Sequence, residues 1–424
     1  MILSGKIRDL WGRKQRRQIA SLFSVNIIGL PLGIITNIIV TRYLGPELFG
    51  DYKFICSIFN FAALFATLGF FQSGNRAIVT LNDKHRIRGL YGALLVVLSI
   101  LFVLMSVGLR TYVYFDDNLT NKGISSLFTI IIPLGFITLW GHLYETVLPA
   151  DNQIGYLAKI RLYPKIINLV MAFLFYILSD KLQWNKLVAI LLLYNGSQLL
   201  IYIYITLKLR PIFGSIKENI KDLLHFNTDF GFNVYIGSIC AVGFGYLTEI
   251  LISYFGVDNV DVGYYSLAVT LTSPLAFIPS TIATTHYKSF AVSKGISKRL
   301  LLLTFSVSAF SVVLLWLIIP FFVKYFYGEA FMPVVRINFF VCIAVFLHGI
   351  ADFYNRFIQA NGYSIMLRNA SIIVGLSTLI TNVLLIPTHG AHGAAYSRII
   401  VGIVYLLVIY YYYKRIIKEK CRYE

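Results

Sequence analysis

The sequence has little charge. Only 13% of its 424 residues are Asp, Glu, Lys or Arg, and 58% are hydrophobic. An ordinary soluble domain carries about 25% charged and about 45–50% apolar residues. The shortage of charge therefore excludes a typical soluble fold. It indicates an all-α polytopic membrane protein.

Cysteine pairs and nucleotide-binding motifs are also missing. The four cysteines, Cys56, Cys240, Cys342 and Cys421, have no spacing that suggests a metal site or a disulfide framework. No stretch of the Gly-x-x-x-x-Gly-Lys type occurs. We therefore expect no cofactor, and an H⁺ or Na⁺ gradient as the energy source. No cleavable signal peptide is visible, because the apolar run after the basic N-terminus is as long as a full span.

Acidic residues are scarce relative to basic ones. There are 19 Asp and Glu against 37 Lys and Arg, which gives a formal net charge of +18. Such a charge invites a nucleic-acid interpretation. The basic residues, however, lie in short loops between apolar runs and not on one soluble face, which is typical of membrane topology. We expect no nucleic-acid partner.

The apolar runs predict twelve transmembrane helices, since about 20 residues cross the hydrocarbon layer. With the N-terminus inside, 28 of the 37 Lys and Arg fall on the inner side and nine on the outer side. This asymmetry predicts that both termini are cytoplasmic. The expected spans lie near residues 19–40, 54–74, 90–109, 124–144, 162–179, 187–207, 231–251, 263–285, 300–322, 334–351, 369–387 and 393–413.

Two similar segments indicate an internal repeat. In the first hinge segment, Thr41–Tyr52, and the second hinge segment, Ser253–Tyr265, an aromatic residue and a glycine end an apolar helix. An acidic residue follows, and glycine with tyrosine opens the next run. A second pair of landmarks, Leu148–Asn152 and Ile358–Gly362, has nearly the same spacing from the hinges. The repeat predicts two six-helix lobes in the same orientation, with a substrate site between them.

The longest inner connection, residues 208–230, predicts an amphipathic helix on the cytoplasmic surface, with apolar residues on one helical face and charged residues on the other. It divides the chain into an N-terminal lobe at 1–207, a linker at 208–230 and a C-terminal lobe at 231–424. The loop at Val257–Val262 is two residues longer than its counterpart in the first half.

Three motifs carry a resemblance to a known family. Arg42–Gly50 is similar to the first-loop motif of the polysaccharide-biosynthesis branch of the MOP superfamily, the multidrug/oligosaccharidyl-lipid/polysaccharide exporters. Tyr325–Phe331 resembles the segment before span ten in that branch, and Leu385–Ala395 resembles its turn between spans eleven and twelve. The chain looks most like the Wzx-type O-antigen flippases over essentially its whole length.

This resemblance implies a MATE-like, V-shaped fold of two six-helix lobes around a central cavity. It also implies a substrate of undecaprenyl diphosphate carrying a short oligosaccharide, moved from the inner to the outer leaflet of the bacterial inner membrane. Membrane lipids, a polysaccharide polymerase and a chain-length regulator are the partners that it suggests.

Charged residues at membrane depth are the first candidates for a substrate site. An isolated charge there costs about 2.5–3.5 kcal/mol, so it tends to line a cavity. Arg42, Arg336 and Arg398 are candidates for binding the diphosphate, although all three could instead extend to the outer interface. Arg336 could also pair with Glu329. Glu249, in an apolar run, is the candidate coupling residue because such a carboxylate can take up and release a proton; the alternative is a structural pair with an arginine.

Polar amides are candidates for bonding sugars. Asn26, Asn37 and Asn233 lie on the predicted spans one and seven, which face the cavity in families of this shape. The alternative is that they form hydrogen bonds between helices. Asp51 and Lys53 flank the first hinge and are expected at the interface. His389 and His392 have a spacing that some metal sites use, but no third ligand is near, so we expect no metal site.

Three rival functions remain. A drug exporter of the same superfamily should have more buried acids than arginines, and the balance here is the reverse. A membrane enzyme of polysaccharide assembly needs a long outer loop, and none is predicted; the loop holding Asp116 and Asp117 is too short to cover a sugar donor. The third rival is a non-transport role as a scaffold within a polysaccharide assembly complex.

Overall fold

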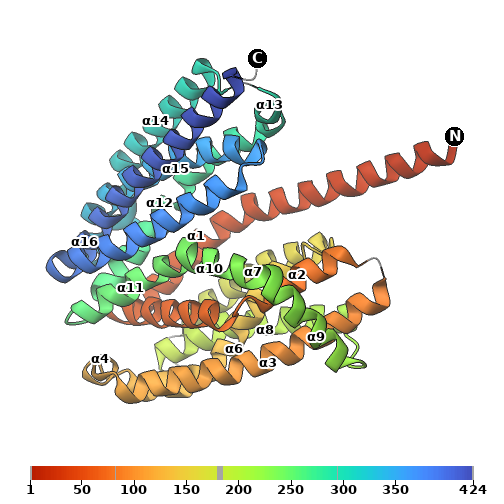
Figure 1. Ribbon diagram of the computed structural model, residues 1–424. Coiled ribbons are helices and arrows are strands. Elements are labelled where there is room, and N and C mark those ends of the chain that lie inside the picture. Colours follow the sequence, from red (N-terminus) through yellow and green to blue (C-terminus); the bar gives the residue numbers. More distant parts are fainter. Residues whose placement is uncertain (1, 82, 179–184, 294, 423–424) are drawn as a thin grey trace. The chain divides into compact units, whose positions relative to one another are not determined.

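A computed structural model describes residues 2–81, 83–178, 185–293 and 295–422, and every regular element within these ranges is helical. In the described residues, nine helices are long and apolar enough to cross a membrane. Two of them, in α1 (Ile2–Ala66) and α16 (Ser364–Arg422), each contain a break (Figure 1). The all-α membrane fold expected from the composition is confirmed, whereas the number twelve stays a prediction.

The first of two compact units comprises Met1–Tyr43 and Phe59–Ile236. In it α7 packs along α8, and α9 packs against α2 and α3. Buried aromatic side chains, among them Phe71, Phe128 and Tyr144, form part of its core. Besides α1, its elements are α2 (Phe70–Thr80), α3 (Lys84–Phe115), α4 (Asp117–Asn121), α5 (Ser125–Ile131), η1 (Ile132–Leu134), α6 (Gly135–Val147), α7 (Ile154–Leu178), α8 (Lys186–Leu209), α9 (Ile216–Phe226), η2 (Asn227–Gly231) and most of α10 (Phe232–Ser238).

The second unit comprises Leu44–Ile58 and Gly237–Glu424. Its largest contacts join α15 to α16 and α12 to α15, and Figure 1 shows α15 and α16 running side by side. Phe290, Phe353 and Phe357 lie in one buried cluster of this unit. Its elements are η3 (Ile239–Gly243), α11 (Phe244–Phe255), α12 (Val260–Thr285), α13 (Tyr287–Val292), α14 (Lys298–Phe322), η4 (Val323–Tyr327), η5 (Glu329–Phe331), α15 (Pro333–Ala360) and α16.

The predicted linker contains a helix, α9, which forms part of the first unit. Its Leu223 is fully buried, and Asp222 pairs with Arg86 of α3 at 3.1 Å. The apolar face of α9 is therefore buried in the unit, and its charged face forms an ion pair, in agreement with its amphipathic sequence. The lobe boundaries at 207 and 231 stay a prediction.

Single glycines break the two longest helices. Gly45 in α1 has φ 73°, and Gly390 in α16 has φ 53°. Both values lie in the left-handed region, which glycine adopts without the steric cost that a Cβ brings. The first expected loop is therefore only a break at Gly45, and the helix resumes at once. Lys53, expected at the membrane interface, lies two turns into this resumed helix.

The two hinge segments contact each other within the second unit. A Cβ built on Gly50 would lie 1.9 Å from the backbone oxygen of Asn259, and one on Gly263 would lie 3.1 Å from the backbone nitrogen of Gly50. Asn259 also donates a hydrogen bond from Nδ2 to Asp51 Oδ1 at 2.7 Å. The glycines that the two segments share are therefore the points where their backbones meet.

We expect Gly50→Ala to destabilise the protein. The added methyl group would overlap the Asn259 backbone, and overpacking of this kind costs about 1–3 kcal/mol. The midpoint of thermal unfolding of the detergent-purified protein should fall by several degrees. Gly33→Ala, in the same helix α1, is the matched control, because nothing lies within 4 Å of a Cβ at that position. Equal behaviour of the two variants would contradict the close contact.

Candidate functional site

Glu249 of α11 lies at the centre of a polar cluster in the second unit. Ser57 of α1 donates a hydrogen bond to its Oε2, and Ser266 of α12 also interacts with the carboxylate. The positive charges of Lys53 and Arg398 both act on it. Lys53 and Ser57 are four residues apart, so they lie on the same face of the helix that follows Gly45. The structure thus brings one predicted acid and one predicted arginine together, and adds Lys53.

A neutral hydrogen-bond network lies beside this cluster. Asn382 Nδ2 donates to Thr248 Oγ1 at 2.8 Å, and Ser397 Oγ donates to Asn382 Oδ1 at 2.7 Å. All three residues are buried. Thr248 precedes Glu249 and Ser397 precedes Arg398, so the network ties α11 to α16 next to these two charged residues. Asn382 and Ser397 were not singled out in the sequence, where they are isolated polar residues in apolar runs.

The Nε atom of Arg398 is buried and has no hydrogen-bond partner among the described residues. No direct ion pair joins Glu249 to a cation among the described side chains, so the carboxylate is held by hydroxyl groups. This arrangement differs from a purely structural carboxylate–arginine pair. The cluster can therefore change its charge or its ligands without losing a salt bridge.

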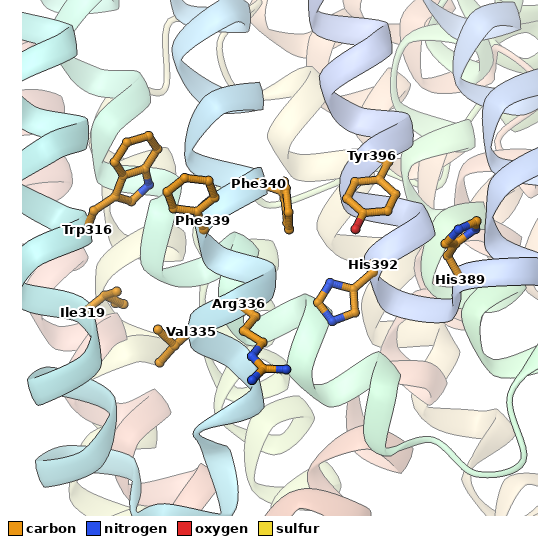
Figure 2. A pocket seen from close by; sticks show the side chains of 9 residues that line it. All are labelled: Trp316, Ile319, Val335, Arg336, Phe339, Phe340, His389, His392 and Tyr396. Carbon is orange, nitrogen blue, oxygen red and sulfur yellow. The ribbon is translucent and has the colours of Figure 1, made fainter.

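Arg336 lies elsewhere in the second unit, in a cavity of about 620 Å³ between α14, α15 and α16. Figure 2 shows Arg336 from α15 and His392 from α16 below the aromatic rings of the pocket. The remaining lining residues are Trp316, Ile319, Val335, Phe339, Phe340, His389 and Tyr396. The cavity combines a cation and two imidazoles with an aromatic wall.

The suggested pairing of Arg336 with Glu329 is wrong. Glu329 pairs with Lys324 at 2.8 Å. Gly328, with φ 98°, turns the chain between η4 and η5 and brings these two side chains together. His389 and His392 both line the Arg336 cavity.

A second, more polar cavity of about 270 Å³ lies between α12, α15 and α16. Tyr405 donates to Asp352 Oδ1 at 2.7 Å, and Asn355 Nδ2 donates to Tyr405 Oη at 2.6 Å. Sequence reasoning missed Asp352 because the predicted tenth span ended at residue 351. The helix α15 in fact continues to Ala360. An unbroken apolar periodicity up to Ile358 was the available signal.

The first unit holds the other predicted residues. Arg42 is exposed and Asn37 half-buried in α1, and Asn233 is exposed in α10. Each of Arg42 and Asn37 has an interaction with another group. The backbone of Asn26 belongs to α1, but its side chain lies outside the described residues. The structure therefore does not bring the three asparagines together in one described cluster.

Additional charges lie on α7. Arg161 makes a two-pronged ion pair with Glu145 of α6, with its shortest contact at 2.5 Å. Lys165 Nζ donates to the backbone oxygen of Gly29 in α1 at 3.1 Å. The expected span began at residue 162, whereas the helix α7 begins at Ile154 and so includes Arg161 as well as Lys165. Arg161 is thus neutralised by a carboxylate, whereas Lys165 has no carboxylate partner among the described residues.

Comparisons with known proteins define the fold. The family model described as "Polysaccharide biosynthesis protein" matches residues 16–287. A lipid II flippase MurJ structure in an inward closed conformation aligns with a TM-score of 0.75 at 16% identity, covering 93% of this chain and 87% of that one. An inward-facing multidrug resistance MATE transporter of the MOP superfamily aligns at 0.66 and 17% identity, over 95% and 99%.

A MOP superfamily transporter from Pyrococcus furiosus, whose structure is described as having a binding pocket of reverse polarity, aligns at 0.54 and 15% identity, over 94% and 96%. No curated protein sequence matches. At these identities the solved structures establish the fold.

The Thr248–Asn382–Ser397 network makes a prediction. Asn382→Leu keeps the side-chain size but removes two buried hydrogen bonds, one to α11 and one across the Gly390 break of α16. A side-chain hydrogen bond between membrane helices is worth about 0.6 kcal/mol. We expect the unfolding free energy to fall by about 1–2 kcal/mol, measured by thermal or denaturant unfolding in detergent. Thr378→Val is the control, because among the described residues the Thr378 hydroxyl bonds only to the Val374 carbonyl of its own helix. A loss of stability as large in the control would contradict the role of the network.

Proposed function

Because the chain belongs to the polysaccharide biosynthesis protein family, we propose that it is a flippase that moves a lipid-linked oligosaccharide across a membrane. The observation that carries this proposal is the family match over residues 16–287 on a fold shared with a lipid II flippase. A transporter, unlike an enzyme, needs no reacting group in its site. The positive charges held within apolar helices suit a phosphate-bearing substrate.

The proposed substrate is an undecaprenyl-diphosphate-linked O-antigen or capsule repeat unit. It would move from the inner to the outer leaflet of the bacterial inner membrane by alternating access. Arg42 and Arg398 would attract the diphosphate, since guanidinium groups bind phosphate oxygens in a two-pronged way. Asn26, Asn37 and Asn233 would bond sugar hydroxyls. Arg336 was predicted to act with them, and it lines a separate cavity of the second unit.

Glu249 is the proposed coupling residue. Its hydroxyl donors keep the carboxylate in place, while Lys53 and Arg398 act on it from a distance. Binding of the substrate diphosphate to Arg398 would withdraw one of these positive charges. The carboxylate would then be compensated by a proton or Na⁺. Substrate and ion would thus be linked through a shared cation. The proposed partners are a polysaccharide polymerase and a chain-length regulator.

The proposed orientation, with both termini cytoplasmic, can be tested with two valines. Val257 is 98% exposed in the second hinge, which is predicted to be outside, and Val292 is 87% exposed at a predicted inner loop. In intact spheroplasts, a membrane-impermeant maleimide should label Val257→Cys and leave Val292→Cys unlabelled until the membrane is opened. Each substitution is made in a cysteine-free background. The reverse labelling pattern would overturn the orientation.

The function is tested in a deletion strain that lacks redundant flippases. We expect loss of surface polysaccharide and a build-up of lipid-linked repeat units on the inner side, with wild-type protein restoring both. Glu249→Gln keeps the size and the Ser57 hydrogen bond but cannot ionise. It should reduce restoration by at least about tenfold, as expected when a required ionisable group is lost.

Glu329→Gln is the matched control, because this carboxylate pairs with Lys324 at the surface. Both variants are compared at equal membrane expression. Full restoration by Glu249→Gln would refute the coupling role while leaving the flippase proposal intact. Normal surface polysaccharide in the deletion strain would refute the flippase proposal itself.

A further inference from the structure

The Arg336 cavity combines features that fit one kind of ligand. We propose that it binds an anionic phospholipid of the surrounding membrane, with the phosphate at Arg336 and His392 and an acyl chain along the aromatic wall. This inference goes beyond the proposed transport function. It concerns a lipid held by the second unit alone.

The charge of the cavity favours an anion. Arg336 has no carboxylate partner among the described residues, and no Asp or Glu lines the cavity. His392 Nδ1 is buried without a hydrogen-bond partner in the same part of the chain. A guanidinium fork and an imidazole nitrogen can together bond several oxygens of one phosphate group. Arg336 and His392 therefore favour a ligand that carries several hydrogen-bond acceptors, as a phosphate group does.

The absence of carboxylates also discriminates between lipid headgroups. The ammonium group of a zwitterionic phosphatidylethanolamine would have no counter-charge among the nine lining residues. A phosphatidylglycerol headgroup carries hydroxyl groups in place of the ammonium. His389 and Tyr396 line the cavity and could bond these hydroxyls. The lining thus favours the anionic lipid.

The apolar wall favours a lipid over a free phosphate ion. Trp316 of α14 stacks on Phe339 of α15 with ring centroids 4.2 Å apart. On the same helix as Trp316, Leu317 and Phe321 are 66% and 77% exposed. Large apolar side chains exposed on a membrane helix contact lipid tails. An acyl chain can therefore continue from the cavity wall onto the lipid-facing surface of α14.

The size of the cavity agrees with this ligand. Its volume of about 620 Å³ lies within the range of about 300–1,000 Å³ that is typical of small-molecule sites. Such a space holds a phosphoglycerol headgroup and the first part of one chain. The rest of the lipid would remain in the bilayer. A whole oligosaccharide repeat unit needs more polar contacts than this wall supplies.

Lipid binding is measured by native mass spectrometry of the full-length protein in detergent with added phosphatidylglycerol, phosphatidylethanolamine or undecaprenyl phosphate. Wild-type protein should retain phosphatidylglycerol about tenfold more strongly than phosphatidylethanolamine. Arg336→Gln should lose about tenfold in phosphatidylglycerol affinity, as expected when a charge-assisted hydrogen bond is removed. His392→Gln should lose less.

Lys324→Gln is the matched control, since Lys324 is a cation of the neighbouring η4 that pairs with Glu329 outside the cavity. It should retain wild-type lipid binding. Equal loss in Lys324→Gln and Arg336→Gln would overturn the proposal, because it would indicate general surface attraction. Stronger retention of undecaprenyl phosphate than of phosphatidylglycerol would overturn it too, because it would assign the cavity to a polyprenyl carrier.

A second measurement does not depend on how the arginine variant folds. Brominated acyl chains quench nearby tryptophan fluorescence, and the Trp316 signal is the difference between wild-type protein and Trp316→Phe. In liposomes, brominated phosphatidylglycerol diluted into unlabelled phosphatidylethanolamine should quench Trp316 more than brominated phosphatidylethanolamine at the same fraction. Equal quenching by the two lipids would overturn the proposed preference.

Discussion

Two glycines decide where the resumed helix of α1 lies. Gly50 packs against the backbone of Asn259, and Gly263 packs against Gly50. Lys53 and Ser57 follow about one and two turns after Gly50, so the same contact sets their approach to Glu249. A Cβ at Gly50 would move this helix away from the carboxylate. The electrostatic environment of the proposed coupling residue thus depends on a contact between two backbones.

Polar groups at membrane depth need partners within the protein, because the hydrocarbon offers none. The Thr248–Asn382–Ser397 chain satisfies this requirement with neutral side chains. It also fixes the register of α11 against α16, and hence of Glu249 and Arg398, the residues next to its two ends. A neutral network can hold two charged residues near each other without pairing them. Under the proposed coupling role, this would leave the charges available to a substrate or an ion.

The sequence was sufficient for the membrane class, for most helix positions and for the hinge glycines, because these follow from apolar length and from backbone freedom. It was not sufficient for the partners of charged side chains. Glu329 pairs with Lys324 and not with Arg336, because Gly328, with its positive φ, turns the chain between Lys324 and Glu329. Lys53, which was expected at the interface, acts on Glu249 of α11, and nothing in its own hinge indicates that partner. Partners across helices depend on side-chain direction, which spacing alone does not give.

The internal repeat is informative where it is inexact. The first hinge turns at Gly45 with positive φ, whereas in the second hinge Gly256 is extended and a short loop runs to Asn259. That longer loop supplies the Asn259 side chain, which accepts a hydrogen bond from Ser253 at 2.6 Å and donates one to Asp51 at 2.7 Å. The donor of this bond, Asn259, lies in the second hinge and its acceptor, Asp51, lies in the first, so the bond depends on a difference between the two hinges. The longer loop of the second hinge makes the repeat inexact, and it also supplies the side chain that joins the two hinges.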